Sequence, residues 1–206
     1  LVNVEIPTAH KMIWDDFRVV ENWTLKGSSG FNPTLSVPED ASAPVNMLFN
    51  YKSARSPYVQ FAREAPIYSR PDTIRIPITS DAVFGDITVC IRANNATQAK
   101  NITITSTAAA GESFEVRIPV AEEFGTDVAI YPLHFELIKL FFNSATPKGE
   151  RYITLPGIYQ VYGSDNGINT GVENTITTQH PTKFLENGQL LIRHNGQIYT
   201  ILGTKR

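Results

Sequence analysis

Tyrosine, arginine and asparagine side chains recur along the short apolar segments of this sequence, and their chemistry suits the recognition of sugars. Aromatic rings stack on the apolar faces of sugars, and a few fixed polar groups read the hydroxyls. Guanidinium groups form paired hydrogen bonds to carboxylate, sulfate or phosphate groups. The candidates of these types are Tyr51, Tyr58, Arg75, Arg92, Asn94 and Arg117. These residues are therefore candidates for a glycan-binding surface, and if the arginines take part they would favour an acidic glycan.

Alternation along three segments places the arginines on the side away from the apolar residues. Successive side chains of a strand point to opposite faces, so in DTIRIPI the isoleucines share one face and Arg75 lies on the other. Arg92 in DITVCIRAN and Arg117 in SFEVRIPV hold the same position. If the three strands are neighbours in a sheet, the arginines share one polar surface. Cys90 falls on the same side as Arg92, which suggests that this surface is a partly covered groove. As an alternative to binding a ligand, the arginines could pair with acidic side chains on neighbouring strands, such as Glu115.

Groups that could perform catalysis are scattered. Cys90 lies in an apolar run and is expected to be a reduced core thiol, and no Gly-x-Ser-x-Gly motif occurs. The histidines are His10, His134, His180 and His194, each isolated from the others in sequence. Neighbouring carboxylates at residues 15–16 and 122–123 point to opposite faces of a strand, so neither pair converges on one glycosidic bond. The sequence predicts no enzymatic activity, no catalytic residues and no cofactor.

Oxygen ligands for a structural calcium ion occur at two places. Asp15 and Asp16 supply carboxylates, and residues 164–167 (SDNG) supply further oxygen atoms. Asp-Asn-Gly is first of all a turn sequence. We therefore assign no metal ligands, and a structural calcium ion remains an alternative to a simple turn.

The elements that must position these side chains are short strands rich in Val, Ile, Thr, Phe and Tyr, bounded by Gly, Pro, Asn, Asp or Ser. Such strands at regular spacing predict an all-β fold, either a β-sandwich or a barrel. VAEEFG is the best candidate for a short helix, and Trp23 in NWTL is expected in the core.

Length and charge narrow the classes of function. The 206 residues suffice for one large domain, with a net charge of −2 and a single cysteine. The absence of a basic cluster argues against nucleic acid as a partner, and the apolar runs are too short for a membrane span. The chain begins abruptly at Leu1, without a signal-peptide pattern, which suggests a mature or excised fragment.

Three regions are predicted along the chain. Residues 1–163 form the sandwich domain. Residues 164–183 form a polar linker, which contains the sequence SDNGINTGVENTITTQHP. Residues 184–206 form a small C-terminal β-hairpin module, in which two Asn-Gly pairs predict tight turns at residues 187–188 and 195–196. A lone hairpin is marginal in water, so this module needs a docking surface or a third strand.

The first region resembles the galactose-binding-like jelly-roll domains of bacterial glycan-active proteins, as found C-terminal to phosphodiester glycosidase domains. The residues that carry the resemblance, over about residues 10–163, are Asp16, Phe17, Trp23, Asn50, Tyr51, the YVQF strand, Pro71, Asp72, Ile74, Ile76 and the segment YITLPGIYQVYG. The resemblance implies a two-sheet antiparallel β-sandwich of the jelly-roll kind, with YITLPGIYQVYG as its closing strand. It also implies a module of carbohydrate-binding type that works beside a catalytic domain of a larger protein.

The C-terminal module resembles the tails that end many exported proteins of anaerobic Gram-negative bacteria. The matching residues are Asn187, Gly188, Leu190, Ile192, Arg193, Gly196, Tyr199 and Gly203. The resemblance implies a secreted or outer-surface bacterial protein, whose tail is either a sorting signal or a structural cap.

Taken together, these observations predict a non-catalytic carbohydrate-binding module of an exported bacterial glycan-processing protein. One alternative is a structural or adhesion domain that has no small-molecule site. The other is a divergent glycoside or phosphodiester hydrolase, whose carboxylates would meet only in the folded chain.

Overall fold

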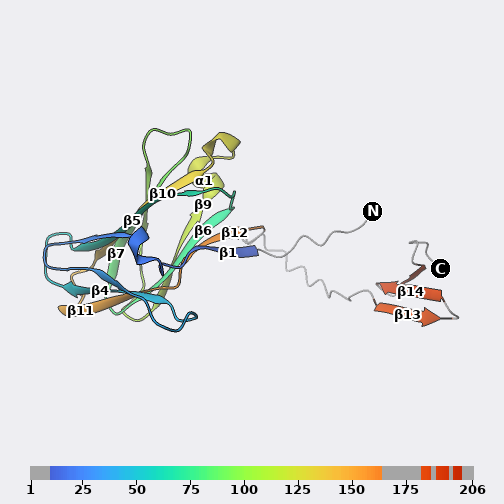
Figure 1. Ribbon diagram of the computed structural model, residues 1–206, viewed down its shortest axis with the longest axis horizontal. Helices are drawn as coiled ribbons and strands as arrows, with labels where there is room; N and C mark the ends of the chain where they lie inside the picture. Colours follow the sequence, from blue (N-terminus) through green and yellow to red (C-terminus); the bar gives the residue numbers. More distant parts are fainter. Residues whose placement is uncertain (1–9, 164–181, 187–188, 195–196, 201–206) are drawn as a thin grey trace. The chain divides into compact units, whose positions relative to one another are not determined.

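The computed structural model describes residues 10–163 and, beyond them, the backbone of residues 182–186, 189–194 and 197–200. The chain divides into two compact units, Leu1–Gly167 and Ile168–Arg206, which are described separately (Figure 1). Apart from residues 182–183, the predicted linker lies outside the described residues, as do both predicted Asn-Gly turns.

One sheet of the first unit has seven strands, all paired antiparallel. They are β1 (His10–Asp15), β3 (Thr34–Ser36), β4 (Val45–Tyr51), β6 (Thr73–Ser80), β9 (Ser113–Pro119), β11 (Gly149–Leu155) and β12 (Ile158–Tyr162). Strand β6 pairs with β9 on one side and with both β11 and β12 on the other. On their far side, β11 pairs with β4 and β12 pairs with β1. The expected closing strand is therefore two strands, β11 and β12, separated by Pro156 and Gly157.

The other sheet has five strands in the order β2 (Thr24–Gly27), β5 (Tyr58–Ile67), β10 (Leu133–Phe142), β7 (Phe84–Arg92) and β8 (Lys100–Thr105). Irregular register in β5, β7 and β10 marks β-bulges, which bend strands locally. Elsewhere the register aligns one row of outward side chains across all five strands. This row is Lys26, Gln60, Lys139, Thr88 and Thr103.

The core lies between the two sheets. The alternation expected for the isoleucines of β6 is confirmed, because Ile74, Ile76 and Ile78 are fully buried. The expectation for Trp23 is also confirmed, since its side chain is only 6% exposed and packs edge-on against Phe61. Each large apolar side chain contributes about 1.5–3 kcal/mol when it is fully buried. The predicted antiparallel β-sandwich is thus the observed fold.

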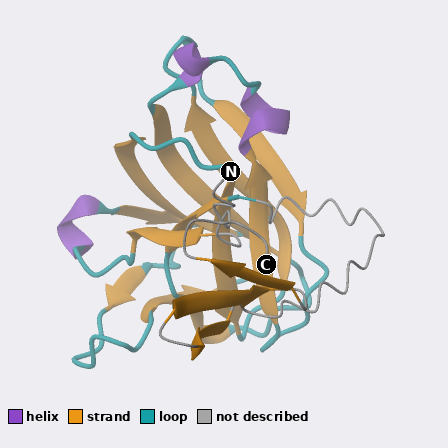
Figure 2. Ribbon diagram, turned by 90° about the vertical axis from the view of Figure 1, so that its right-hand side faces the viewer, coloured by secondary structure: helices purple, strands orange, loops and turns teal. Residues whose placement is uncertain are grey.

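Helical segments are few and short in the described part of the chain (Figure 2). They are η1 (Val20–Asn22), α1 (Val120–Phe124) and η2 (Val128–Ile130). The first residues of VAEEFG form α1 as predicted, and the helix ends at Gly125, whose φ of 86° belongs to the left-handed region that glycine tolerates. No helix among the described residues has the length and apolarity that crossing a membrane requires.

The second unit contains a three-stranded antiparallel sheet made of β13 (Thr182–Glu186), β14 (Gln189–His194) and β15 (Gln197–Thr200). Strand β14 lies in the middle and pairs with both neighbours. The expected hairpin thus has a third strand, which supplies the partner that an isolated hairpin lacks.

Candidate functional site

The prediction that Arg75, Arg92 and Arg117 share one surface is wrong, because these arginines belong to different sheets. Arg75 of β6 lies directly opposite Arg117 of β9 in the seven-stranded sheet. Arg92 lies on β7 of the five-stranded sheet. All three side chains lie on the outer side of their strands, away from the core, so the two groups face opposite sides of the sandwich.

Each of these arginines is also held by carboxylates, as the alternative interpretation expected. Arg92 donates from Nε to Glu136 at 2.9 Å and from a terminal nitrogen to Glu64 at 3.1 Å. Arg117 donates to Glu115 at 2.7 Å, and a terminal nitrogen of Arg75 lies 3.8 Å from the same carboxylate. The arginines are therefore engaged with the protein itself, which removes the main reason to expect an acidic glycan.

The three other predicted ligand-binding residues do not form a joint site either. Tyr51 is 3% exposed, and its hydroxyl donates to the backbone oxygen of Asn143 at 3.3 Å, so it belongs to the core. Tyr58 is half-buried on the outside of the five-stranded sheet. Asn94 is exposed just after β7, and its backbone N–H donates to the oxygen of Ile130. Of the six, Tyr58 and Arg92 lie on the outer face of the five-stranded sheet, and Arg75 and Arg117 lie on that of the seven-stranded sheet.

We call the outer side of the five-stranded sheet the ion-paired face, defined by Lys26, Tyr58, Gln60, Arg92, Glu136 and Lys139. The ammonium group of Lys139 lies 3.9 Å from the ring centre of Tyr58 and 4.8 Å from that of Phe141, which are cation–π contacts. These contacts cover aromatic surface that a sugar would otherwise stack on. On this face the charged side chains are therefore engaged with neighbouring side chains, Arg92 with two carboxylates and Lys139 with aromatic rings.

Cys90 belongs to the same side of the sheet. Its thiol donates to the Asn101 side-chain oxygen at 2.7 Å. Burial, reinforced by the nearby Glu136 carboxylate, raises the pKa of the Cys90 thiol, because both disfavour the thiolate. The thiol therefore stays protonated at neutral pH and is a poor nucleophile.

The outer side of the seven-stranded sheet, in contrast, is hollowed. We call it the grooved face, and define it by Leu48, Asn50, Glu150 and Tyr152 together with Ile13 and Tyr159. Its first groove has a volume of about 440 Å³. The residues that line the first groove are Phe31, Asn32, Thr34, Leu48, Phe49, Asn50, Glu150, Arg151 and Tyr152.

Strand register explains how the first groove arises. In β4 and β11, Met47, Phe49 and Ile153 point into the core, so the residues between them point outward. Leu48 lies directly opposite Tyr152, and both remain well exposed, at 45% and 41%. An aromatic ring beside an aliphatic side chain at outward positions, with polar groups around them, is typical of a binding surface.

The second groove, of about 290 Å³, lies where β11 and β12 are separated. It is lined by Ile13, Asp16, Arg18, residues 41–44, Pro156 and Tyr159. Leu155 and Ile158, three positions apart, both point into the core, so the break shifts the alternation by one residue and turns Tyr159 outward. Gly157 is required here: its φ is 146°, and a Cβ would lie 3.0 Å from the Asp15 backbone oxygen.

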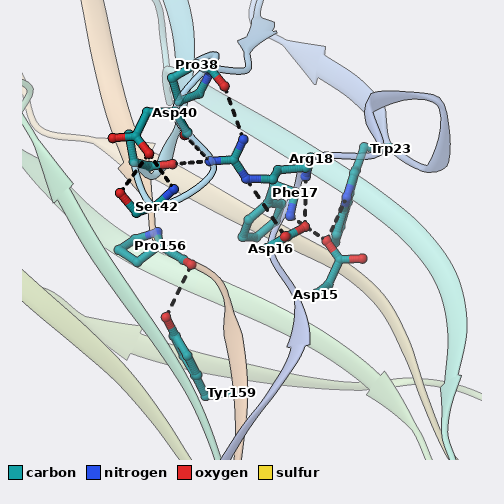
Figure 3. Close-up of polar contacts among 11 residues, drawn as sticks. Asp15, Asp16, Phe17, Arg18, Trp23, Pro38, Asp40, Ser42, Pro156 and Tyr159 are labelled. Atoms are coloured by element: carbon teal, nitrogen blue, oxygen red, sulfur yellow. Dashed lines mark hydrogen bonds and ion pairs between the residues drawn. The ribbon is translucent and has the colours of Figure 1, made fainter.

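One arginine holds the segment that borders the second groove (Figure 3). Arg18 donates to three backbone oxygens, those of Pro38 at 3.1 Å, Asp40 at 2.7 Å and Ala43 at 2.5 Å. Asp40 in turn accepts hydrogen bonds from the Ser42 backbone N–H and hydroxyl, both at 2.8 Å, and these lower the pKa of the Asp40 carboxyl. The segment is therefore fixed before any ligand arrives.

Asp15 anchors the chain just before Arg18. Its carboxylate accepts hydrogen bonds from the Phe17 backbone N–H at 2.7 Å and from the Trp23 indole at 3.2 Å, and it forms an ion pair with Arg63 (Figure 3 shows the first two). The side chain is only 10% exposed. The neighbouring Asp16 accepts a hydrogen bond from the Arg18 backbone N–H at 3.1 Å. Both aspartates thus have structural roles.

These contacts bear on the calcium and hydrolase alternatives. Among the residues that the structure describes, no three His, Cys, Asp or Glu side chains are grouped as metal ligands would be. The other expected calcium segment, residues 164–167, lies outside the described residues. Of the second carboxylate pair, Glu123 is bound to Lys100 at 2.7 Å. Three of the four carboxylates considered for glycoside hydrolysis, those of Asp15, Asp16 and Glu123, are thus engaged in hydrogen bonds or ion pairs.

Sequence patterns pointed to neither groove. The missed residues are Leu48, Tyr152 and Tyr159. Two signals were present: Leu48 is an apolar residue at an outward position of β4, and Pro156 with Gly157 interrupts an otherwise regular alternation. Both signals need to be combined with the pairing of β4 and β11, which local patterns do not reveal.

Comparison with known proteins supports the fold. No family model matches the chain, and no curated protein matches it. The solved structures that it resembles include carbohydrate-binding modules.

One neighbour is a module described in a study of promiscuous specificity among carbohydrate-binding modules of the β-sandwich superfamily. It has a TM-score of 0.50 and 12% identity, over 73% of this chain and 62% of that one. Another is the family 11 module of a cellulosomal cellulase from Clostridium thermocellum, with a TM-score of 0.46 and 15% identity over 77% of this chain and 97% of that one. A third is a module specific for non-crystalline cellulose, with a TM-score of 0.44 and 15% identity, over 73% and 94% of the two chains. The likeness to the first of these three modules shows a shared β-sandwich fold.

Proposed function

We propose that the first unit is a non-catalytic carbohydrate-binding module, and that its glycan binds in the first groove of the grooved face. The observation that carries the proposal is the exposed pair Leu48 and Tyr152 over a hollow of about 440 Å³. The β-sandwich fold that the chain shares with a carbohydrate-binding module supports it.

The groups around Tyr152 suit the recognition of a sugar. The ring offers an apolar surface for the C–H face of a pyranose, and Leu48 extends that surface across the strand pair. Asn32, Asn50 and Glu150 supply hydrogen-bond donors and acceptors at the rim. Stacking in the centre with hydrogen bonds at the rim is how such a groove would select a glycan.

A neutral glycan fits this groove better than the acidic one that the arginines suggested. Arg75, Arg92 and Arg117 are engaged with carboxylates, and the first groove itself contains Glu150. The carboxylate of Glu150 would repel an acidic sugar and accept hydrogen bonds from neutral hydroxyls.

Affinity gel electrophoresis of the full 206-residue chain tests the proposal. Neutral polysaccharides (mixed-linkage β-glucan, galactan, xylan and mannan) and acidic ones (polygalacturonate and alginate) are cast into separate native gels. We expect retardation by at least one neutral polysaccharide, and we expect Tyr152→Ala to weaken it about tenfold, as for a central aromatic contact. Tyr68→Ala is the matched control, because Tyr68 is an even more exposed tyrosine outside both grooves.

Three results would contradict the proposal. No retardation by any polysaccharide would favour a structural or adhesion domain without a small-molecule site. Retardation that Tyr152→Ala leaves intact would place the binding surface elsewhere. Release of reducing sugar or of phosphate-linked sugar on incubation would revive the hydrolase alternative.

We further propose that the module belongs to an exported bacterial glycan-processing protein and works beside a catalytic domain. The tail-like motif from Asn187 to Gly203 supports export, with β13–β15 as its scaffold. Fusing residues 164–206 to a periplasmic reporter in a bacterium with the corresponding secretion route would test this. Surface display of the reporter is expected, and retention in the periplasm would leave the tail as a structural cap.

A further inference from the structure

We infer that the ligand of the grooved face is an internal stretch of a linear glycan that lies across both grooves, rather than a terminal sugar. This inference rests on the proposed function, because it concerns the extent of the same binding surface. Three observations carry it: the alignment of the two grooves, the side chains between them, and the fixed border of the second groove.

The two grooves follow one another along the same edge of β6. Tyr152 lies on β11 and Tyr159 on β12, and both strands pair with β6 in the same direction. Tyr159 comes seven positions after Tyr152, which at about 3.3 Å per residue corresponds to at most about 23 Å. A single sugar ring is far shorter than this, so only a chain of sugars can contact both tyrosines.

The side chains between the grooves are small and polar. Register places Ser36, Asn46, Thr154 and Thr79 side by side in one row across β3, β4, β11 and β6. The Thr154 hydroxyl donates to the Asn46 side-chain oxygen at 2.8 Å, which keeps both side chains low against the sheet. None of the four is large enough to close the path between the grooves, and all offer groups that hydrogen-bond to sugar hydroxyls.

The second groove has apolar and polar parts like the first. Ile13 and Tyr159 face each other across β1 and β12, and Ile13 is largely exposed. The Lys11 ammonium lies 3.7 Å from the Tyr159 ring centre, so one side of this ring is already occupied. Tyr159 therefore offers a weaker stacking surface than Tyr152, and we expect the second groove to add affinity without being sufficient for binding.

The Arg18 contacts fix the border of the second groove in advance. Three backbone oxygens of residues 38–43 are bound by one guanidinium, so this segment does not have to be ordered when a glycan binds. Arg18 thus acts as a positioning residue for the far end of the surface.

Isothermal titration with oligosaccharides of increasing length tests the inference. The probes are the disaccharide, tetrasaccharide and octasaccharide of whichever neutral polysaccharide retards the full-length protein in the affinity gel. We expect the affinity to rise from the disaccharide to the octasaccharide by about tenfold or more. Borohydride reduction of the octasaccharide's end should leave its affinity unchanged, because the chain end would take no part in binding.

Variants separate the two grooves. Tyr159→Ala should lower the affinity for the octasaccharide about fivefold and leave that for the disaccharide unchanged, whereas Tyr152→Ala should weaken both. Ile13→Ala, at a mostly exposed position, gives a second test if Tyr159→Ala does not fold.

An affinity that reaches its maximum at the disaccharide, or that is lost on end reduction, would overturn the inference while leaving the proposed function intact. Equal losses for short and long ligands in the second-groove variants would also overturn it. Failure of every polysaccharide to bind would instead overturn the proposed function, and this inference with it.

Discussion

The two outer faces of the sandwich differ in how their polar groups are used. On the ion-paired face, Arg92 is bound by Glu64 and Glu136, and Lys139 lies over Tyr58. On the grooved face, Leu48 and Tyr152 are exposed side by side over a hollow. Ion pairs occur on both faces, since Arg75 and Arg117 share Glu115 on the grooved face. What distinguishes the grooved face is apolar surface that stays in contact with water beside a hollow.

The difference shows why charge alone is a poor guide to a binding surface. Exposed ion pairs such as Arg92–Glu64 contribute little to stability, typically about 0–1 kcal/mol, and their groups are already hydrogen-bonded. An exposed aromatic side chain beside an exposed leucine leaves apolar surface in contact with water, which is unfavourable. A bound ligand would cover that surface. Covering the grooved face with a ligand would therefore be more favourable in free energy than covering the ion-paired face.

The largest expected effect concerns the support beneath the grooved face. Asp15→Ala removes a mostly buried carboxylate and leaves Arg63 and the Trp23 indole without their acceptor, so we expect the free energy of unfolding to fall by about 3 kcal/mol. Urea unfolding followed by tryptophan fluorescence measures this. Asp16→Ala, at a more exposed neighbouring carboxylate, is the control and should cost less than about 1 kcal/mol. Equal losses in the two variants would mean that Asp15 is no anchor.

A smaller effect is expected at the border of the second groove. Arg18→Lys keeps the charge but replaces a planar fork by a single ammonium, which cannot reach three backbone oxygens at once. We expect a loss of about 1 kcal/mol in stability and faster amide hydrogen exchange in residues 38–43. Unchanged exchange there would show that the segment is held by other contacts.

The smallest effect is expected on the ion-paired face. Arg92→Ala should change the free energy of unfolding by no more than about 1 kcal/mol, because its partner Glu64 is largely exposed. Retardation in the affinity gel should not change at all. A loss of glycan binding in this variant would reverse the assignment of roles to the two faces.

The core and the strands could be predicted because they depend on local alternation. The isoleucines of β6, the position of Trp23 and the short helix at residues 120–124 all follow from neighbours in the sequence. Burial on one side of a strand is enough to specify them.

The candidate site could not be predicted because it depends on which strands pair. Arg92 lies in the same local pattern as Arg75, yet β7 and β6 belong to different sheets. The exposure of Tyr152 beside Leu48 likewise requires the pairing of β11 with β4, whose residues are about a hundred positions apart in the chain. Pro156 and Gly157 looked like part of one strand, and only the buried position of Ile158 reveals the shift in alternation.

Chemical-shift mapping by nuclear magnetic resonance tests the central claim most directly. The labelled protein is titrated with the oligosaccharide that it binds best, and the backbone amide shifts are followed along the two outer faces. We predict that the largest changes fall on Leu48, Asn50 and Tyr152, with smaller ones near Tyr159. Changes concentrated on Lys26, Gln60 and Lys139 instead would contradict the account.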